Sequence, residues 1–323
     1  MSVPGVLRLG VPEVLRLGTR KSPMAMTQSG LVARAITERT GVPVELVGVT
    51  TKGDVDRAQI TQIGGTGVWV SALRDQLLTG QVDLAVHSLK DLPTGQPDGI
   101  VLAAVPVRDD PRDALIARDG AKLADLPAGA TIGTGAPRRA AQLLLLRKDI
   151  QCVPIRGNAD TRFGKVTAGE LDAVVLATAG LGRLGRLDLV SQIFEPDEML
   201  PAPGQGALAV ECRAGDPELA ELLASVDDPL SRAAVTAERT VLAVLEAGCS
   251  APIGAYAAGT AEHLQLEAAV IATHGGQALR ERSAGDPAAA EQLGRQIASR
   301  LLARGAATLI ATPPERTNGT DAQ

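Results

Sequence analysis

The order of strand and helix signals along the first two thirds of this chain restricts its fold more than any other feature. Ser22 followed by Pro23 is a helix-start signal, because Ser caps a first turn and Pro suits the first helical position; this helix is expected to reach about Thr40. The signals that follow are a strand over 42–51, a glycine-bearing loop over 62–70, a helix through Leu78 and an apolar strand over 82–88. Strands that alternate with helices predict a parallel α/β sheet.

A second run of the same kind begins near Pro111, so we expect two α/β domains of similar size. Its elements are a strand and turn over 131–136, a helix over 137–148, a strand over 150–157, a helix over 158–170 and a strand over 171–180. From about Pro229 the pattern changes to a long helix that ends at 246–248, strands over 252–259 and 264–273, and a helix over 287–306. This last part predicts a small α+β domain.

The two ends of the chain carry weaker signals. The sequence VLRLG occurs at 6–10 and again at 14–18, and only the second copy leads into a helix-start signal, so the first copy is expected to be a disordered extension. The polar tail over 313–323 is expected to be disordered as well.

Composition excludes several classes of protein. The net charge is -5, which gives no overall attraction to nucleic acid or to anionic membranes, and four aromatic residues are too few for base-stacking platforms. Cys152, Cys212 and Cys249 lie far apart without CxxC spacing, so neither a disulfide framework nor a metal site is expected. We see no membrane span or signal-peptide core, and we expect a cytoplasmic protein.

Basic residues are placed where an open α/β sheet binds anions. Lys90, Arg138, Arg139 and Arg156 fall at strand-to-helix junctions, where helix N-termini and strand ends form the binding crevice. Adding those on adjacent turns gives seven candidate cations: Arg20, Lys90, Arg138, Arg139, Arg156, Arg162 and Arg183. Together they predict a ligand with several carboxylates or phosphates, although a single arginine alone is more often an ordinary surface residue. The stretch 157–166 fails as a Walker motif.

Two further residues admit both a chemical and a structural interpretation. Asp91 beside these cations should stay ionised and could stabilise a developing positive charge, or it could cap a helix ahead of Pro93. Cys249 could be a nucleophile or a small buried hydrophobe, and spacing alone does not choose, because no His or Asn partner is evident. The three histidines, His87, His263 and His274, are scattered and are interpreted as non-catalytic.

The motifs taken together resemble the porphobilinogen deaminase (hydroxymethylbilane synthase) family, from about Leu15 to Thr312. They are GTRKSPMAM, DLAVHSLKDLP, DDPRDA, GTGAPRRAAQL, RGNADTR, LPAPGQGALAVECR, TAERTVL and LEAGCSAPIGAY, in the family's order and spacing. The resemblance implies two periplasmic-binding-protein-like α/β domains and a third α+β domain. The expected boundaries are 10–107 with 207–225, 108–206, and 226–313.

The resemblance also implies the chemistry. Cys249 would carry a covalent dipyrromethane cofactor through a thioether, and four porphobilinogen units would be added to it with loss of ammonia before water releases the linear tetrapyrrole. Asp91 would be the catalytic aspartate, which steadies the cationic species formed when ammonia leaves. The implied cofactor-binding residues are Cys249, Ser88, Lys90, Thr134, Arg138, Arg139 and Arg162; the implied substrate-binding residues are Arg20, Ser22, Arg156, Arg183 and Gln205. A monomer without nucleic-acid or membrane partners is expected.

The chain departs from the family pattern in two places. Gln62 and Thr66 stand where many members have lysines, and Gly135 to Pro137 replace a run of hydroxyl residues, which puts loop contacts and turnover rate in doubt. A solute-binding or effector-sensing module of the periplasmic-binding-protein type is the alternative from another class, since its two domains would look much the same. That alternative gives Cys249 no role. A phosphoryl-transfer enzyme is disfavoured by the failed Walker motif.

Overall fold

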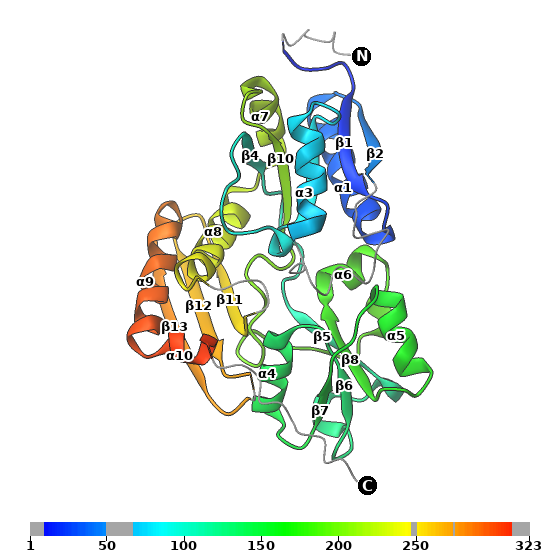
Figure 1. Cartoon of the computed structure of the whole chain (residues 1–323), viewed down its shortest axis with the longest axis vertical. Helices are drawn as coiled ribbons and strands as arrows, with labels where there is room; N and C mark the ends of the chain where they lie inside the picture. The colour runs from blue at the N-terminus through cyan, green and yellow to red at the C-terminus, as the bar shows by residue number, and fades with distance from the viewer. Residues whose placement is uncertain (1–9, 50–66, 247–250, 274, 312–323) are drawn as a thin grey trace.

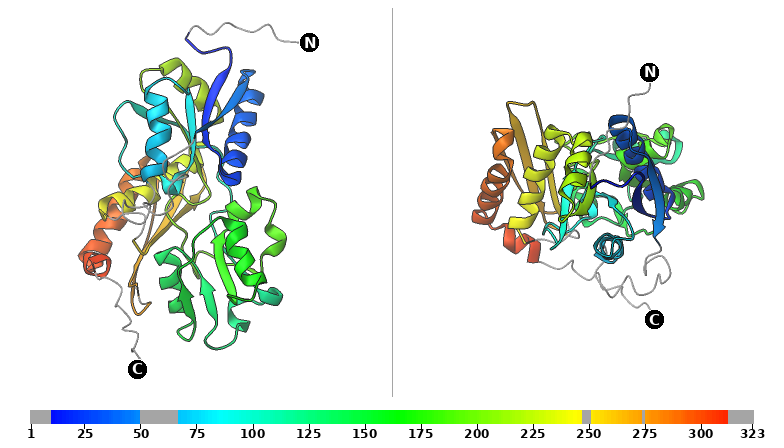
Figure 2. Two further views of the ribbon diagram at one scale, coloured as in Figure 1. Left: turned by 45° about the vertical axis from the view of Figure 1, so that its right-hand side comes forward. Right: turned by 90° about the horizontal axis from the view of Figure 1, so that it is seen from above.

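The computed structural model describes residues 10–49, 67–246, 251–273 and 275–311. Within these ranges three β-sheets with flanking helices form the molecule. Figures 1 and 2 show two α/β domains, one above the other, with the third sheet and its helices beside them. The expected fold class, two α/β domains and a small C-terminal α+β domain, is confirmed.

The first sheet has the strand order β2-β1-β3-β10-β4. Its strands are β1 (Leu15–Arg20), β2 (Val44–Val49), β3 (Leu84–Ser88), β4 (Ile100–Ala104) and β10 (Leu208–Arg213). Its helices are α1 (Pro23–Thr40), α3 (Gly67–Leu78) and α7 (Pro217–Leu223), and the three-residue turn η2 (Leu89–Asp91) follows β3. The Ser22 hydroxyl accepts a hydrogen bond from the Ala25 amide at the start of α1, which confirms the predicted cap.

The second sheet has the order β7-β6-β8-β5-β9. Its strands are β5 (Asp113–Ala117), β6 (Thr131–Gly133), β7 (Gln151–Val153), β8 (Ala173–Ala177) and β9 (Gln192–Ile193). Its helices are α4 (Pro137–Leu146), α5 (Ala159–Thr167) and α6 (Thr178–Arg183). Short 3-10 turns at Arg118–Gly120, Leu123–Asp125, Leu187–Leu189 and Ala224–Val226 complete the two domains.

Both sheets are mixed, so the expectation of parallel sheets is wrong for one part of each. β10 runs antiparallel to β3 and β4, and β5 runs antiparallel to β8 and β9. The chain leaves the first domain at the end of β4 and returns from the second domain into β10. Because β10 begins beside the ends of its neighbours β3 and β4, it must run in the opposite direction to both.

The third sheet is antiparallel, with the order β11-β12-β13. It contains β11 (Ile253–Gly259), β12 (Leu264–Ile271) and β13 (Ala278–Gly285), and its helices are α8 (Pro229–Val244), α9 (Ala290–Ala303) and α10 (Ala306–Ala311), with a 3-10 turn at Pro287–Ala289. Its core joins α8 and α9 to the sheet through residues such as Val241, Leu266 and Ile297. Two of its elements, β13 and α10, were not predicted, because β13 is a mostly polar edge strand and α10 is a single short turn beyond a glycine.

In the first two domains the strands β4, β5, β9 and β10 and the helix α7 were not predicted either. The remaining differences are local. The residues Gly67–Val70 belong to α3 rather than to a loop, and the expected strand over 171–180 ends at Ala177, where α6 begins. The loop residues 62–66, the first nine residues and the tail over 313–323 lie outside the described residues. Among the described helices, none is long and apolar enough to cross a membrane.

Candidate active site

Two crossings of the chain connect the α/β domains and bring strand ends together. Residues 105–112 lead from β4 into β5, and residues 200–207 lead back into β10. The crossings touch, since the Asp109 amide donates to the Gly206 carbonyl. Gly206 has φ +88°, and a Cβ there would lie 2.4 Å from the Asp109 oxygen, so this close approach requires glycine. Gln205 is thereby fixed between the domains.

Gln205 links the turn after β3 to the start of β5. Its side-chain oxygen accepts a hydrogen bond from Lys90 Nζ at 3.0 Å, and its amide nitrogen donates to Asp113 Oδ1 at 2.8 Å and to the Pro111 carbonyl at 2.7 Å. Gln205 is 1% exposed. Because Lys90 belongs to the first domain and Asp113 to the second, a buried polar chain joins the two domains at the crevice.

Asp113 is the centre of the site, and the sequence analysis did not single it out. This carboxylate is fully buried at the first position of β5, where it accepts from Arg138 Nη1 at 2.7 Å and from Arg139 Nε at 2.9 Å. Burial alone would raise the pKa of Asp113, but the charges of Arg138 and then Arg139 hold that pKa well below its usual range. The signal was present in the motif DDPRDA, which sets an acid at the start of an apolar strand.

Arg138 and Arg139 lie in the first turn of α4, and neither side chain is exposed to solvent. Arg138 also donates to the Leu200 carbonyl, and Arg139 Nη1 donates to the Val175 carbonyl at 3.0 Å. Burial lowers the pKa of Arg138. Both arginines are therefore held by the protein's own groups, and any ligand carboxylate they contact shares them with Asp113.

Cations outnumber carboxylates around Asp113. Burial, and next the charge of Arg139, lower the pKa of Lys90 to about 8 against the opposing charges of Asp91 and Asp113. Arg162 has its pKa lowered by burial and by Arg139, and its Nε donates to the Gly157 carbonyl at 2.9 Å. Positive charges gathered this closely repel one another, and an anionic ligand would relieve that repulsion. The structure thus brings four of the seven candidate cations together: Lys90, Arg138, Arg139 and Arg162.

The remaining candidate cations lie around this centre. Arg183, in α6, is tied to the crossings, since it donates to the Gly206 carbonyl at 2.6 Å and to Asp109 at 2.8 Å. Arg20 ends β1, the strand beside β3, and is half-buried. Arg156 is exposed and lines a separate cavity of about 710 Å³.

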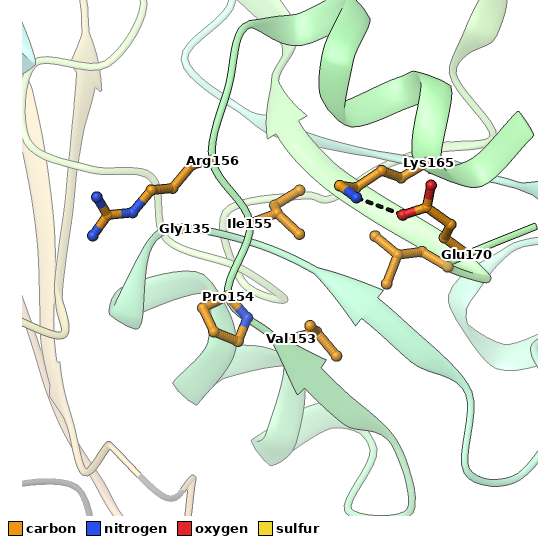
Figure 3. A pocket seen from close by; sticks show the side chains of 8 residues that line it. Gly135, Val153, Pro154, Ile155, Arg156, Lys165 and Glu170 are labelled. Carbon is orange, nitrogen blue, oxygen red and sulfur yellow. Dashed lines mark hydrogen bonds and ion pairs between the residues drawn. The ribbon is translucent and has the colours of Figure 1, made fainter. Parts of the chain in front are cut away.

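That cavity lies at the β7 edge of the second domain. In Figure 3 the Arg156 side chain extends to one side of the segment 153–155, while Lys165 and Glu170 pair on the other side. Glu170 neutralises Lys165, and apart from Arg156 the remaining lining residues are apolar, so the interior of this cavity does not suit a ligand with several carboxylates.

The hydroxyl candidates make local contacts. Ser88 Oγ accepts from the Gln28 side-chain amide at 3.0 Å, and Thr134 Oγ1 accepts from the Ala136 amide at 3.2 Å. Ser22 caps α1, as described above. Each of these residues stands at the end of a strand or at the start of a helix.

Asp91 does not cap a helix, so that interpretation is wrong. It is the last residue of η2, whose cap position is Ser88, and the chain continues in extended conformation through Leu92 with φ -78° and ψ 136°. The next regular element is β4, which begins at Ile100. Asp91 is exposed beside Lys90. Its carboxylate is therefore exposed to solvent and is not used to cap a helix.

A second buried acid, also missed by the sequence analysis, joins the third domain to the crossings. Glu238, in α8, is fully buried and accepts from Arg108 at 2.6 and 3.0 Å, from the Gly204 amide at 2.7 Å and from the Ala257 amide at 2.8 Å. Arg108 also donates to the Gln205 carbonyl at 2.8 Å. All three domains therefore meet within one hydrogen-bonded network.

Cys249 lies outside the described residues. Its flanks belong to the third domain, where Leu245 and Ile253 are both in the core. Burial raises the pKa of Cys152 and of Cys212 to about 11, so these two thiols are poor nucleophiles at neutral pH. In the described ranges no group of three or more His, Cys, Asp or Glu residues could hold a metal ion.

Comparison with known proteins relates most of the chain to one family. Residues 15–221 match the family model "Porphobilinogen deaminase, dipyromethane cofactor binding domain", and residues 232–303 match "Porphobilinogen deaminase, C-terminal domain". A porphobilinogen deaminase of Thermobifida fusca is 61% identical over 305 residues, which cover 92% of this chain and 95% of the relative. Porphobilinogen deaminase 1 of Streptomyces coelicolor is 56% identical, covering 92% and 98%, and that of Nocardia farcinica is 51% identical, covering 98% and 94%.

Solved structures are more distantly similar. The methionine binding protein MetQ is 13% identical with a TM-score of 0.43, covering 67% of this chain and 89% of that one. The VFT2 domain of Bordetella pertussis BvgS is 18% identical with a TM-score of 0.42, covering 66% and 86%.

Proposed function

The chain belongs to the porphobilinogen deaminase family, and from that premise we propose which of its residues hold the cofactor and the substrate. As a member, it is a transferase of tetrapyrrole biosynthesis. It condenses four porphobilinogen units, each with loss of ammonia, onto a dipyrromethane primer, and water then releases hydroxymethylbilane.

Cys249 is the proposed attachment point of dipyrromethane. The thiol would form a thioether to the first ring, and the bound group then primes the growing chain. Cys152 is half-buried and Cys212 is buried, and the raised pKa values of their thiols support this assignment by disfavouring these two cysteines. The matched family model for residues 15–221 names the same cofactor.

The observation that carries the proposal is the excess of cations around Asp113. A pyrrole with acetate and propionate groups supplies the carboxylates that such a site lacks, and these fit guanidinium and ammonium donors. We assign cofactor binding to Ser88, Lys90, Thr134, Arg138, Arg139 and Arg162, and substrate binding to Arg20, Ser22, Arg156, Arg183 and Gln205. Since Gln205 is buried between Lys90 and Asp113, its part is to orient Lys90 toward the ligand.

Asp91 is the proposed catalytic residue. In each condensation the methylene–nitrogen bond of porphobilinogen breaks, ammonia leaves, and a carbon–carbon bond to the growing chain forms as the attacked ring carbon loses its proton. Positive charge develops on the substrate as ammonia leaves. The exposed carboxylate of Asp91, at the end of η2, can stabilise that charge and accept hydrogen bonds from pyrrole N–H groups. Its neighbour Lys90 would hold a carboxylate of the same ligand.

The solute-binding alternative is not favoured, because the family match includes the third domain and extends through residue 303. We also propose that the protein acts as a cytoplasmic monomer on porphobilinogen, without nucleic acid or membrane as partner. The domain boundaries 10–107 with 207–225, 108–206 and 226–313 stay part of the proposal, and the membership of β10 in the first sheet supports them.

Turnover of porphobilinogen by the purified protein tests this function. We expect one ammonia released for each porphobilinogen consumed and four consumed for each hydroxymethylbilane formed. Asp91→Asn serves as the matched control, since it keeps the size of the side chain. Consumption of porphobilinogen without release of ammonia would contradict the assigned reaction. Equal rates in the parent and in Asp91→Asn would contradict the role assigned to Asp91.

A further inference from the structure

We propose that Arg239, in helix α8 of the third domain, is a positioning residue that holds the turn carrying Lys90 and Asp91. The catalytic consequence of this inference rests on the proposed function. Its geometry rests on the hydrogen bonds that Arg239 makes to the turn. Arg239 Nη1 donates to the carbonyls of Leu89 at 3.1 Å and Leu92 at 3.0 Å, and Nη2 donates to the Pro93 carbonyl at 2.6 Å.

These acceptors bracket Asp91 on both sides. Leu89 is the first residue of η2, and Leu92 and Pro93 directly follow Asp91. One planar guanidinium that bonds all three carbonyls fixes the direction in which the intervening side chains leave the backbone. Bonds from a charged donor are also stronger than those between neutral groups.

Besides the bonds from Arg239, the turn is held by the bond from Lys90 to Gln205 and by contacts at its two ends. A 3-10 turn of three residues makes little internal hydrogen bonding, here the Leu92 amide to the Leu89 carbonyl at 3.1 Å. The Leu89 amide is bonded to the Ala207 carbonyl, and Leu89 and Leu92 pack in one cluster with Val235 of α8. Helix α8 therefore contacts the turn through an apolar residue and through Arg239, which lies one helical turn further along.

Packing alone does not secure the segment that follows. A cavity of about 580 Å³ lies between the stretch Leu92–Pro97 and the helices α8 and α9, and Arg239 is part of its lining. Since side chains that border a cavity lack close neighbours on that side, the hydrogen bonds of Arg239 take a larger share in placing the turn.

The consequence for catalysis follows from where α8 leads. The helix ends at Val244, and the chain then reaches Cys249, so one helix holds the turn with Asp91 and precedes the proposed cofactor attachment. Displacing a catalytic group by about 1 Å can cost roughly 100-fold in rate. We therefore expect loss of Arg239 to lower the rate of condensation rather than the capacity to carry the cofactor.

Arg239→Met and Arg232→Met form the matched pair for the test. Arg232 lies on the same helix and also donates to two backbone carbonyls, those of Leu102 at 3.3 Å and Ala103 at 2.9 Å, but these belong to β4. Both variants are purified with cofactor, checked by intact mass, and compared for thermal unfolding, kcat, KM and amide hydrogen exchange. Arg239→Lys, which keeps the charge but has fewer donors, is measured alongside and carries the test if Arg239→Met does not fold.

We expect Arg239→Met to retain the cofactor mass, to exchange the amides of residues 89–92 faster, and to lose roughly 10- to 100-fold in kcat with little change in KM. Arg239→Lys should recover part of that loss, and Arg232→Met should keep kcat within about two-fold of the parent. The proposal is overturned if Arg239→Met and Arg232→Met lower stability alike while amide exchange at residues 89–92 and kcat stay at parental values. A parent protein without turnover would instead refute the proposed function, and the exchange comparison would still decide the positioning role.

Discussion

Replacing Asp113 with Asn removes one charge from the centre of the site with almost no change of shape. Asp113 is fully buried and accepts hydrogen bonds from Arg138, Arg139 and Gln205. An amide in its place keeps one acceptor but cannot neutralise two guanidinium groups that are less than a tenth exposed. The substitution therefore leaves buried positive charge without its counter-charge.

Removing one partner of a buried ion pair costs about 3 to 5 kcal/mol. At about 2 to 4 °C per kcal/mol for domains of ordinary size, the melting temperature should fall by roughly 6 to 20 °C. Pyrrole carboxylates bound nearby would replace part of the missing charge. We therefore expect a smaller loss in protein that carries the cofactor than in the Cys249→Ser background, where the cofactor is absent.

Thermal and urea unfolding of Asp113→Asn, with and without Cys249→Ser, measure both effects. Glu170→Gln is the control, because it breaks an exposed ion pair with Lys165 and should cost no more than about 1 kcal/mol. If Asp113→Asn is no less stable than Glu170→Gln, Asp113 does not neutralise the buried arginines. If its loss is the same with and without cofactor, no ligand carboxylate replaces its charge.

Two other residues give predictions of a different kind. Asp91→Asn should lose roughly 100-fold or more in single-turnover rate, and Asp91→Glu should keep part of that rate. Both variants should unfold like the parent, because Asp91 is exposed. A fully active Asp91→Asn protein would show that Asp91 is not catalytic. For Lys90, with a pKa of about 8, kcat/KM for porphobilinogen should fall as pH rises through about 8, and Lys90→Arg should move that fall to higher pH; unchanged profiles would contradict it. The pKa of Lys90 in the folded protein lies below its ordinary value of 10.5, so between about pH 8 and pH 10.5 the unfolded chain binds more protons at this group than the folded protein does. The contribution of Lys90 to the free energy of unfolding therefore rises with pH across that range.

The sequence predicted well what local signals determine. The cap at Ser22, the helix over Pro23–Thr40 and the cations after β3 and β6 all follow from residue type and spacing within short windows. The antiparallel return of β10 could not be predicted in this way, because its direction depends on where the chain crosses between domains. Local pattern alone tells little about such long-range connections.

The site was predicted as a set of cations but not as a network. Asp113 and Glu238 were inside recognised motifs, yet an acid in an apolar stretch is identified as a buried counter-charge only when its partners are located. Those partners come from distant segments, as Arg138 does for Asp113 and Arg108 for Glu238. The interpretation of Asp91 as a helix cap was wrong for the converse reason, since the backbone after it is extended.

The intact mass of the purified protein, before and after brief exposure to porphobilinogen, tests the central claim most directly. The parent should exceed its sequence mass by two porphobilinogen units less two molecules of ammonia, and should then show further steps of one such unit. Cys249→Ser should have its sequence mass alone, whereas Cys152→Ser and Cys212→Ser should match the parent. A parent at its bare sequence mass, or a Cys249→Ser protein with the full added mass, would contradict the account.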